Sequence, residues 1–392
     1  MELWLDSNSD GSKFIKFLYL VGFEFEKVER LSLESRVSDD LLNLFFLRAN
    51  NVKELLLTNF GDSDLEKVAD KFLGLKKLIF NASEVSVRTL DYLLSKCEIE
   101  FLGLNFPSMG HLRYLVANSK VHKLKALYYC SSLSGSSEEA GEEEELLCRF
   151  VRSCGENLEE LSLYTFANIE KICNTIAENC PKFESLSLEI FQDNQFFTLK
   201  MLEMIAEKCP KFPRKLVIDS NADLVCTHEE AINFMEKFYW RVEELSLCCQ
   251  EETRFIETLM DTAYLDPQKV RKIEFGFLDI PLKPFFESIL QMEKLSELKV
   301  VCVQYDKEIK EKLELRSTSL QKLNFAISSK TGCVRVICDN LTRFNTGNDI
   351  TVETKRTLES MHTVEDPFNV LSHLKVHEFS ISQSLDFVQF QK

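Results

Sequence analysis

The chain is poor in the residues and motifs that mark several common classes of protein. Only 12 of its 392 residues are glycine and 8 are proline. It contains no phosphate-binding loop and no G-x-S-x-G, H-E-x-x-H or C-x-x-C motif. No run of 18 apolar residues is present, so we expect no membrane-spanning helix and no membrane partner. We further expect that the protein is not an enzyme and holds no cofactor.

Basic residues are also in deficit. The 47 lysines and arginines face 63 aspartates and glutamates, which gives a net charge of −16. An acidic surface repels phosphate backbones, so we expect no nucleic-acid partner. A convincing export signal is lacking at the N-terminus, and we therefore interpret the 13 cysteines as reduced thiols. The expected compartment is the cytoplasm or the nucleus.

What the chain does contain is an apolar register, L-x-x-L-x-L with allowed substitutions. It returns 14 times at steps of 23 to 34 residues. Periods in the twenties with this pattern are typical of a leucine-rich-repeat solenoid, which offers one long concave face for binding. The register begins at Val28, Val52, Leu75, Ile99, Leu124, Leu158, Phe183, Pro213, Val242, Val270, Leu295, Leu320, Gly347 and Val376.

One repeat illustrates the expected unit of structure. Leu186 and Leu188 alternate with Ser187, which predicts a strand with one buried face. Apolar residues then recur at helical spacing over 199–208, and the helix is expected to end at Cys209-Pro210. Strands joined through helices must be parallel, and such crossovers are right-handed. The sequence therefore predicts a right-handed α/β solenoid (a horseshoe) over 28–392, with a parallel inner sheet and convex helices.

Two segments depart from this register. Residues 1–27 carry Phe14, Phe17 and Val21 at helical spacing, so we expect an N-terminal helical cap. The second is an insert over 131–145, which has six glutamates between 138 and 145. Its polar, like-charged composition favours a flexible, solvated loop, and the alternative is a recognition element for a basic partner.

Candidate metal ligands and catalytic groups are weak. His373 and His377 are four residues apart but lie at a predicted strand and have no third ligand nearby. Cys248-Cys249 is interpreted as containing a buried thiol. Acidic pairs such as Glu159-Glu160 recur at a regular repeat position without a pocket. We expect no metal site and no catalytic residues.

The outward positions of the predicted strands give the candidate protein-binding site. Several of these positions in the N-terminal half hold apolar or aromatic residues, where a bare face would be polar. Later repeats mainly show small or charged residues there. Two alternatives remain open: a one-residue slip in the face assignment, or an insert that folds over the patch. The candidate protein-binding residues are Leu56, Ile79, Phe101, Tyr128 and Tyr164.

Two helix ends carry a family resemblance. Cys180-Pro181-Lys182-Phe183 and Cys209-Pro210-Lys211-Phe212 resemble the cysteine-containing class of leucine-rich repeats, and Cys97 and Cys154 occupy similar places. This class is typical of F-box proteins, the substrate-receptor subunits of cullin-RING ubiquitin ligases. The resemblance implies a non-catalytic substrate-recognition subunit that binds a protein on its concave face.

The chain also departs from that class. Only 27 residues precede the first repeat, and they contain no Leu-Pro opening of an F-box. We therefore expect the F-box to be lost, reduced to a remnant or never present, with residues 1–27 as the place where a Skp-type adaptor would bind. The alternative function is a scaffold or inhibitor that clamps a protein partner with no link to ubiquitin.

Overall fold

The structure is a computed structural model, and its chain divides into two compact units. The first unit comprises residues 1–158 with 372–392, and the second comprises 159–371. Within them the structure describes residues 2–5, 24–33, 47–131, 137–165, 167–190, 197–220, 224–225, 228–249, 265–276, 291–305, 313–329, 333–338, 343–346, 351–354 and 378–379.

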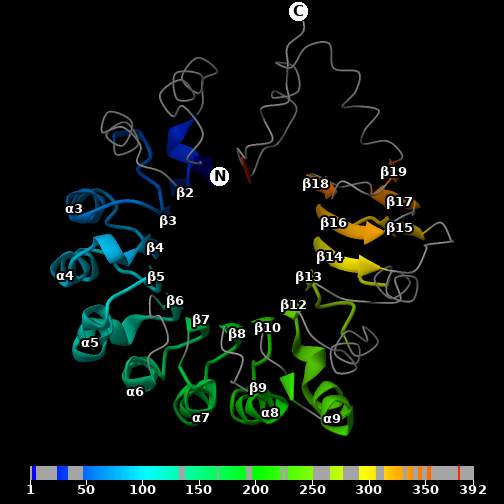
Figure 1. Cartoon of the computed structure of the whole chain (residues 1–392). Helices are drawn as coiled ribbons and strands as arrows, with labels where there is room; N and C mark the ends of the chain where they lie inside the picture. The colour runs from blue at the N-terminus through cyan, green and yellow to red at the C-terminus, as the bar shows by residue number, and fades with distance from the viewer. Residues whose placement is uncertain are drawn as a thin grey trace, which may run out of the picture. The chain divides into compact units, whose positions relative to one another are not determined.

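The first unit is a parallel sheet with helices on one side (Figure 1). Each strand pairs with the next along the chain. The strands are β1 (Glu2–Leu5), β2 (Arg30–Leu33), β3 (Glu54–Leu57), β4 (Lys77–Asn81), β5 (Phe101–Asn105) and β6 (Ala126–Cys130). The helical elements are η1 (Phe25–Lys27), α3 (Asp62–Lys71), η2 (Ala82–Glu84), α4 (Val87–Lys96), α5 (Met109–Ala117), η3 (Ser119–Lys123) and α6 (Ser137–Cys154).

One repeat of this unit shows how the sequence produces it. In β3, Leu55 and Leu57 are buried while Glu54 and Leu56, which alternate with them, are half-buried, as the period of two requires. Helix α4 begins after Ser86, whose side chain accepts a hydrogen bond from Thr89 N–H at 3.3 Å. The buried residues of α4 face the sheet. Burial of one large apolar side chain stabilises the folded state by about 1.5–3 kcal/mol.

The second unit repeats the pattern. Its main sheet runs through β7 (Glu160–Thr165), β8 (Ser185–Ile190), β10 (Lys215–Ser220), β12 (Glu244–Cys249), β13 (Lys272–Gly276), β14 (Glu297–Tyr305), β16 (Lys322–Ser329) and β18 (Arg343–Thr346). Its helical elements are α7 (Ile169–Asn179), α8 (Leu199–Lys208), α9 (His228–Phe238) and η4 (Tyr239–Arg241). A short pair joins β9 (Phe197–Thr198) to β11 (Leu224–Val225).

These elements confirm the predicted fold class, a leucine-rich-repeat α/β architecture with a parallel sheet. The core leucines expected from the register are buried where their side chains are described: Leu31, Leu55, Leu78, Leu161, Leu186, Leu245 and Leu298. Continuity of one stack from the first unit into the second stays a prediction from the repeat register. No helix among the described residues is long and apolar enough to cross a membrane.

The C-terminal repeats differ from the prediction of convex helices. There, β15 (Leu313–Ser317), β17 (Cys333–Cys338) and β19 (Thr351–Thr354) form a second parallel sheet. The sequence of β17, CVRVIC, alternates and is rich in β-branched residues, which favours a strand. The register expected from Gly347 was also misplaced, because the main-sheet strand of that repeat is β18.

The N-terminal segment begins with a strand. Residues 2–5 form β1, which pairs with β2 in the same register as the later repeats, so this part of the predicted cap over 1–27 is wrong. The expected helix over 14–21 lies outside the described residues. On its other side, β1 pairs with β20 (Glu378–Phe379), which lies in the repeat predicted from Val376.

The described part of the acidic insert is largely helical. The prediction of a flexible loop over 131–145 is wrong from Ser137 onward, because α6 begins there and continues to Cys154. Glutamates in a first turn stabilise the positive end of the helix dipole. The side chains of Leu147, Phe150 and Val151 are buried and pack the helix against the rest of the first unit. This part of the insert is therefore anchored to the fold.

Candidate functional site

Four of the five candidate binding residues lie together on neighbouring strands of the first unit. Leu56 on β3 is in register with Ile79 on β4, and Ile79 with Gly103 on β5, which faces Tyr128 on β6. Phe101 lies two residues before Gly103 on the same face. All four side chains are half-buried, whereas the alternate residues of these strands are buried. We call Leu56, Ile79, Phe101 and Tyr128 the sheet patch.

At these four positions the burial pattern agrees with the predicted outward face and argues against a one-residue slip. The described part of the insert lies on the other side, because α6 packs beside α5 (Figure 1). Tyr164, the fifth candidate, lies on β7 of the second unit, where it is half-buried in register with Glu189. It is not counted in the sheet patch.

Gly103 shapes the centre of the sheet patch. A Cβ atom placed on Gly103 would lie 2.6 Å from Cγ1 and 2.8 Å from Cγ2 of Ile79. Atoms that close clash, so the missing side chain lets Ile79 lie across β5. The apolar surface of Ile79 is thereby extended toward β6, where Tyr128 occupies the same register row.

Phe101 carries a cation on its ring. Lys77 on the adjacent strand places Nζ 4.2 Å from the ring centroid. A cation over an aromatic face stabilises by about 0.5–1 kcal/mol at exposed sites and more where water is excluded. This contact adds a modest preference for the observed position of the Phe101 ring and places a positive charge beside the sheet patch.

A further exposed aromatic residue was missed by reasoning from the sequence. Phe106 follows β5, has a φ of 53° and leaves 46% of its surface exposed. A non-glycine residue in this left-handed region is strained, and such strain tends to occur at functional sites. Its N–H donates to the carbonyl of Cys130 at 2.8 Å, which fixes the turn. Neither the backbone angle nor the exposure could be read from Phe106-Pro107.

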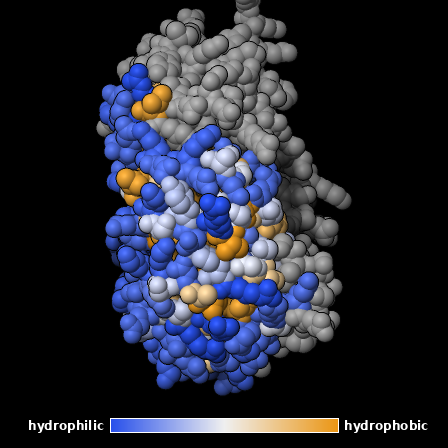
Figure 2. All heavy atoms as spheres, turned by 90° about the vertical axis from the view of Figure 1, so that its left-hand side faces the viewer, coloured by the Kyte–Doolittle hydropathy of each residue, from blue (hydrophilic) through white to orange (hydrophobic). Residues whose placement is uncertain are grey.

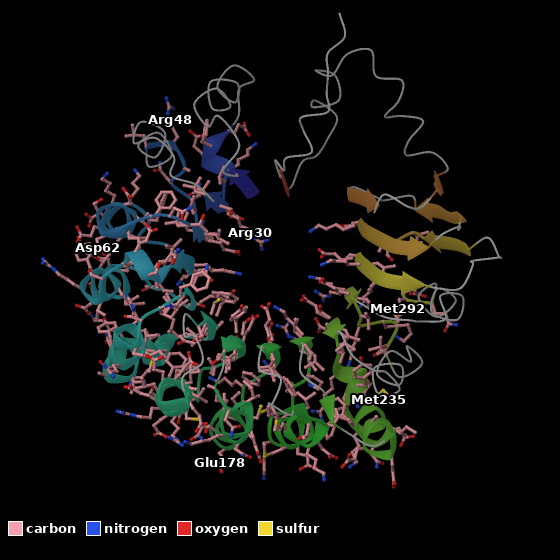
Figure 3. All side chains as sticks on the ribbon, in the orientation of Figure 1. Arg30, Arg48, Asp62, Glu178, Met235 and Met292 are labelled. Carbon is pink, nitrogen blue, oxygen red and sulfur yellow. The ribbon has the colours of Figure 1, made fainter. Side chains whose placement is uncertain are left out.

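The helix side of the first unit has a different character. Figure 2 shows this side as predominantly hydrophilic, with hydrophobic residues in separate spots. Figure 3 places Arg30 on the sheet side and Asp62, at the start of α3, on the helix side. The apolar residues that neighbour one another in register are those of the sheet patch, on the sheet side.

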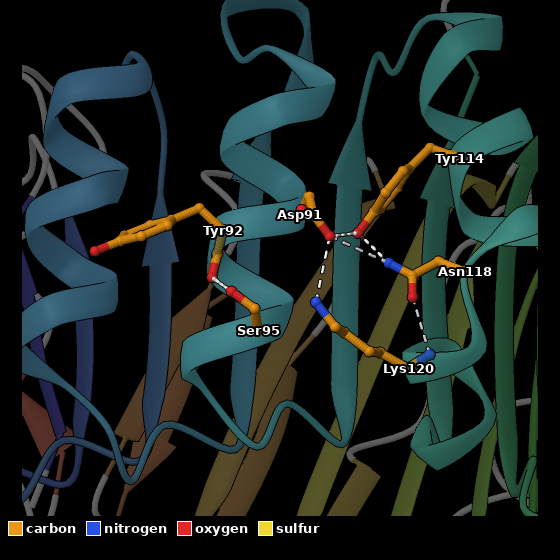
Figure 4. A network of polar contacts seen from close by, with 6 residues as sticks. All are labelled: Asp91, Tyr92, Ser95, Tyr114, Asn118 and Lys120. Atoms are coloured by element: carbon orange, nitrogen blue, oxygen red, sulfur yellow. Dashed lines mark hydrogen bonds and ion pairs between the residues drawn. The ribbon is translucent and has the colours of Figure 1, made fainter.

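Polar contacts join neighbouring helical elements on the helix side of the first unit (Figure 4). Tyr114 on α5 donates to Asp91 on α4 at 2.6 Å, and Lys120 Nζ lies 3.4 Å from the same carboxylate. Burial, with the hydrogen bond to Asp91, raises the pKa of Tyr114, while the hydrogen bond from Tyr114 lowers the pKa of Asp91. Tyr92 donates to Asp70 on α3 in the same way, at 2.6 Å. These contacts connect consecutive repeats, which is a structural role.

On the second unit the outward row is polar and ion-paired. Lys215 on β10 reaches past Ser185 on β8 to Glu160 on β7, with Nζ and Oε1 2.8 Å apart. Lys322 pairs with Glu297 at 3.0 Å. Ser185 is small enough to pass beneath the Lys215 side chain. Its hydroxyl is buried, without a hydrogen-bond partner among the described residues.

Catalytic and metal-binding groups do not assemble in the part of the chain that is described. No cluster of three histidine, cysteine or acidic side chains there could hold a metal ion. Seven described cysteines are buried and form no disulfide among the described residues, and burial raises the pKa of Cys97 and Cys209 to about 11. Glu160 is engaged with Lys215, as described above. His373 and His377, and the side chains of Cys248 and Cys249, lie outside the described residues.

Comparisons with known proteins add similarities of fold only. The chain matches no protein-family model and no curated protein. A chain in the crystal structure of the Rad7 and Elc1 complex in yeast shares 15% identity at a TM-score of 0.49, covering 89% of this chain and 93% of that one. The TLR13–ssRNA13 complex gives 15% identity, a TM-score of 0.34 and coverages of 82% and 47%. A Bacteroides fragilis protein gives 11%, 0.34, 76% and 86%. At these identities and TM-scores they carry no functional argument.

Proposed function

We propose that the protein is a non-catalytic binding module that recruits another protein through the sheet patch. The observation that carries this proposal is the row of half-buried apolar and aromatic side chains on adjacent strands, Leu56, Ile79 and Tyr128 with Phe101 beside them. Contiguous apolar groups left accessible to solvent mark interfaces, and aromatic residues at their centre contribute most of the binding energy.

We further propose that the recruited protein is a substrate for ubiquitin ligation. Support comes from the resemblance to the cysteine-containing repeat class and from the places of its cysteines. Cys97, Cys180 and Cys209 each follow the last residue of a helix. The Cys209 thiol donates to the carbonyl oxygen of Cys180 in the preceding repeat at 3.2 Å, which links one helix-ending cysteine to the next.

A scaffold or inhibitor that clamps its partner is the alternative. Adaptor binding distinguishes the two. The full chain is mixed with a purified Skp-type adaptor, and a variant lacking residues 2–5 is the comparison. A complex with the full chain supports the ubiquitin-ligase role. No complex at micromolar concentrations favours the scaffold or inhibitor, and leaves protein binding through the sheet patch in place.

The binding role is tested with Phe101→Ala and Tyr128→Ala. The partner is first identified from native extract by affinity purification with the wild-type chain. Each variant should then weaken that partner by at least about tenfold, because central aromatic residues typically contribute about 2 kcal/mol or more. Leu73→Ala is the control, since Leu73 is 59% exposed and lies outside the sheet patch. Wild-type affinity in both patch variants would place the contact surface elsewhere.

A further inference from the structure

Lys77 differs from the other lysines on and beside the sheet of the first unit. Lys53 pairs with Glu29 at 2.8 Å, Lys76 with Glu100 at 3.0 Å, and Lys125 with Glu100 at 2.7 Å. Among the described residues, no carboxylate lies within ion-pair distance of Lys77, whose ammonium instead stands over the Phe101 ring.

The neighbouring strands explain why Lys77 lacks a carboxylate. On β3, Glu54 is in register with Lys77 but pairs with Arg30 on β2, at 3.1 Å. On β5, the register position holds Phe101. The corresponding row of the second unit places glutamates beside its lysines, as in Lys322 with Glu297.

The charge of the sheet face therefore differs from that of the whole chain. The chain has a net charge of −16, yet the outward charged residues of β2–β5 are Arg30, Glu54 and Lys77, a sum of +1. A half-buried ammonium without a carboxylate adds electrostatic attraction for an acidic group from a partner. One such cation is too few for a nucleic-acid backbone, whose binding depends on several neutralised phosphates.

We infer that the sheet patch binds an extended protein segment in which an aspartate or glutamate lies close to an apolar residue. This inference rests on the proposed function. The carboxylate contacts Lys77, and the apolar side chain covers Ile79 and Tyr128. The Lys77 row and the Ile79 row are two residues apart along the strands, about 6.6 Å. In an extended segment that runs along the strands, the acidic and apolar residues are therefore separated by one residue.

Selection from random peptides displayed on phage tests this inference, with the full-length chain immobilised. The wild type should enrich peptides with an acidic residue within two positions of an aromatic or aliphatic one. Replacement of that acid by alanine in a synthetic peptide should weaken binding by about tenfold or more, the range expected for a hydrogen bond to a charged group. Lys77→Gln should remove the acidic preference, and Lys77→Glu should replace it with a basic one.

Lys53→Glu is the matched control, because Lys53 lies just before β3 and pairs with Glu29. It should leave the selected peptides unchanged. Peptides that keep their acidic preference on Lys77→Glu, or a wild-type selection without acidic enrichment, would overturn the inference. If the selected peptides nevertheless bind Phe101→Ala more weakly than wild type, the sheet patch remains the proposed binding surface although the acidic preference is refuted. Peptides that bind Phe101→Ala and Tyr128→Ala like wild type would contradict the proposed function itself.

Discussion

At the scale of single residues, His111 shows how a side chain can replace a usual capping residue. It occupies the third position of α5, where glutamate or glutamine closes a capping box. Its Nδ1 accepts from Ser108 N–H at 3.1 Å, so the ring proton is on Nε2, which donates to the Val85 carbonyl at 2.9 Å. This arrangement requires the neutral imidazole, and burial lowers the pKa of His111.

A pH dependence of stability follows from this capping box. The folded-state pKa of His111 lies below the unfolded value of about 6.5, so its contribution is present above that pH and is lost as the pH falls. Urea unfolding between about pH 7.5 and 5.5 should therefore show a falling free energy of unfolding. His111→Gln keeps an acceptor for Ser108 N–H and should reduce the slope. An unchanged slope in this variant would assign the effect to other groups.

The buried cysteines give a second prediction at this scale. Burial raises the pKa of Cys154 to about 12 and those of Cys97 and Cys209 to about 11, so their reactive thiolate forms are rare at neutral pH. Alkylation of the native protein followed by peptide mass spectrometry should leave the seven described cysteines unmodified, free of disulfides, and reactive only after unfolding. A bridge such as Cys154–Cys180 would contradict the expectation of reduced thiols.

At the scale of elements, strands β2 to β6 of the first unit were predictable, and β1 and α6 were not. Inward residues such as Leu55 and Leu78 recur strictly because each strand has one buried face. The glutamate run was interpreted as solvated, although Glu143, Leu147 and Phe150 follow one another at helical spacing. The helical spacing of Leu147 and Phe150, continued back to Glu143, was a signal for a helix that begins before residue 146. The strand β17 was missed because a repeat with a strand in the helix position has no period of 3.6 to detect.

The docking of α6 depends on one of its glutamates. Glu143 is fully buried and accepts a hydrogen bond from the Tyr129 hydroxyl at 2.6 Å. Arg113 on α5 adds a contact to Glu142, with its Nε 2.8 Å from Oε1. Two acidic residues of the insert are thus engaged within the unit. They support the interpretation of this part of the insert as structural.

Tyr129→Phe tests this anchoring. Loss of a donor to a buried carboxylate should lower the free energy of unfolding by about 1–3 kcal/mol, measured by urea denaturation. Tyr92→Phe is the control, since its hydroxyl bonds Asp70 near the surface and should matter by less than about 1 kcal/mol. Equal effects of the two substitutions would show that Glu143 does not depend on Tyr129.

At the scale of the whole molecule, sequence and structure agree on the class of fold and on where its apolar surface is exposed. The alternation of Leu56, Ile79 and Tyr128 with buried residues was sufficient to place them on the open side of the sheet. The position of Lys77 over Phe101, with no carboxylate beside it among the described residues, and the strained turn at Phe106 were not predictable, because each depends on neighbours brought together by the register. The charge of −16 is distributed so that this face remains nearly neutral.

Site-specific photocrosslinking tests the central claim most directly. The full-length chain carries p-benzoylphenylalanine in place of Tyr128 on the sheet side or in place of Tyr92 on the helix side, two half-buried tyrosines of the first unit. After irradiation in native extract, the Tyr128 position should yield a defined crosslinked protein that Phe101→Ala diminishes, and the Tyr92 position should not. Crosslinks to the same protein from the Tyr92 position alone would contradict binding through the sheet patch.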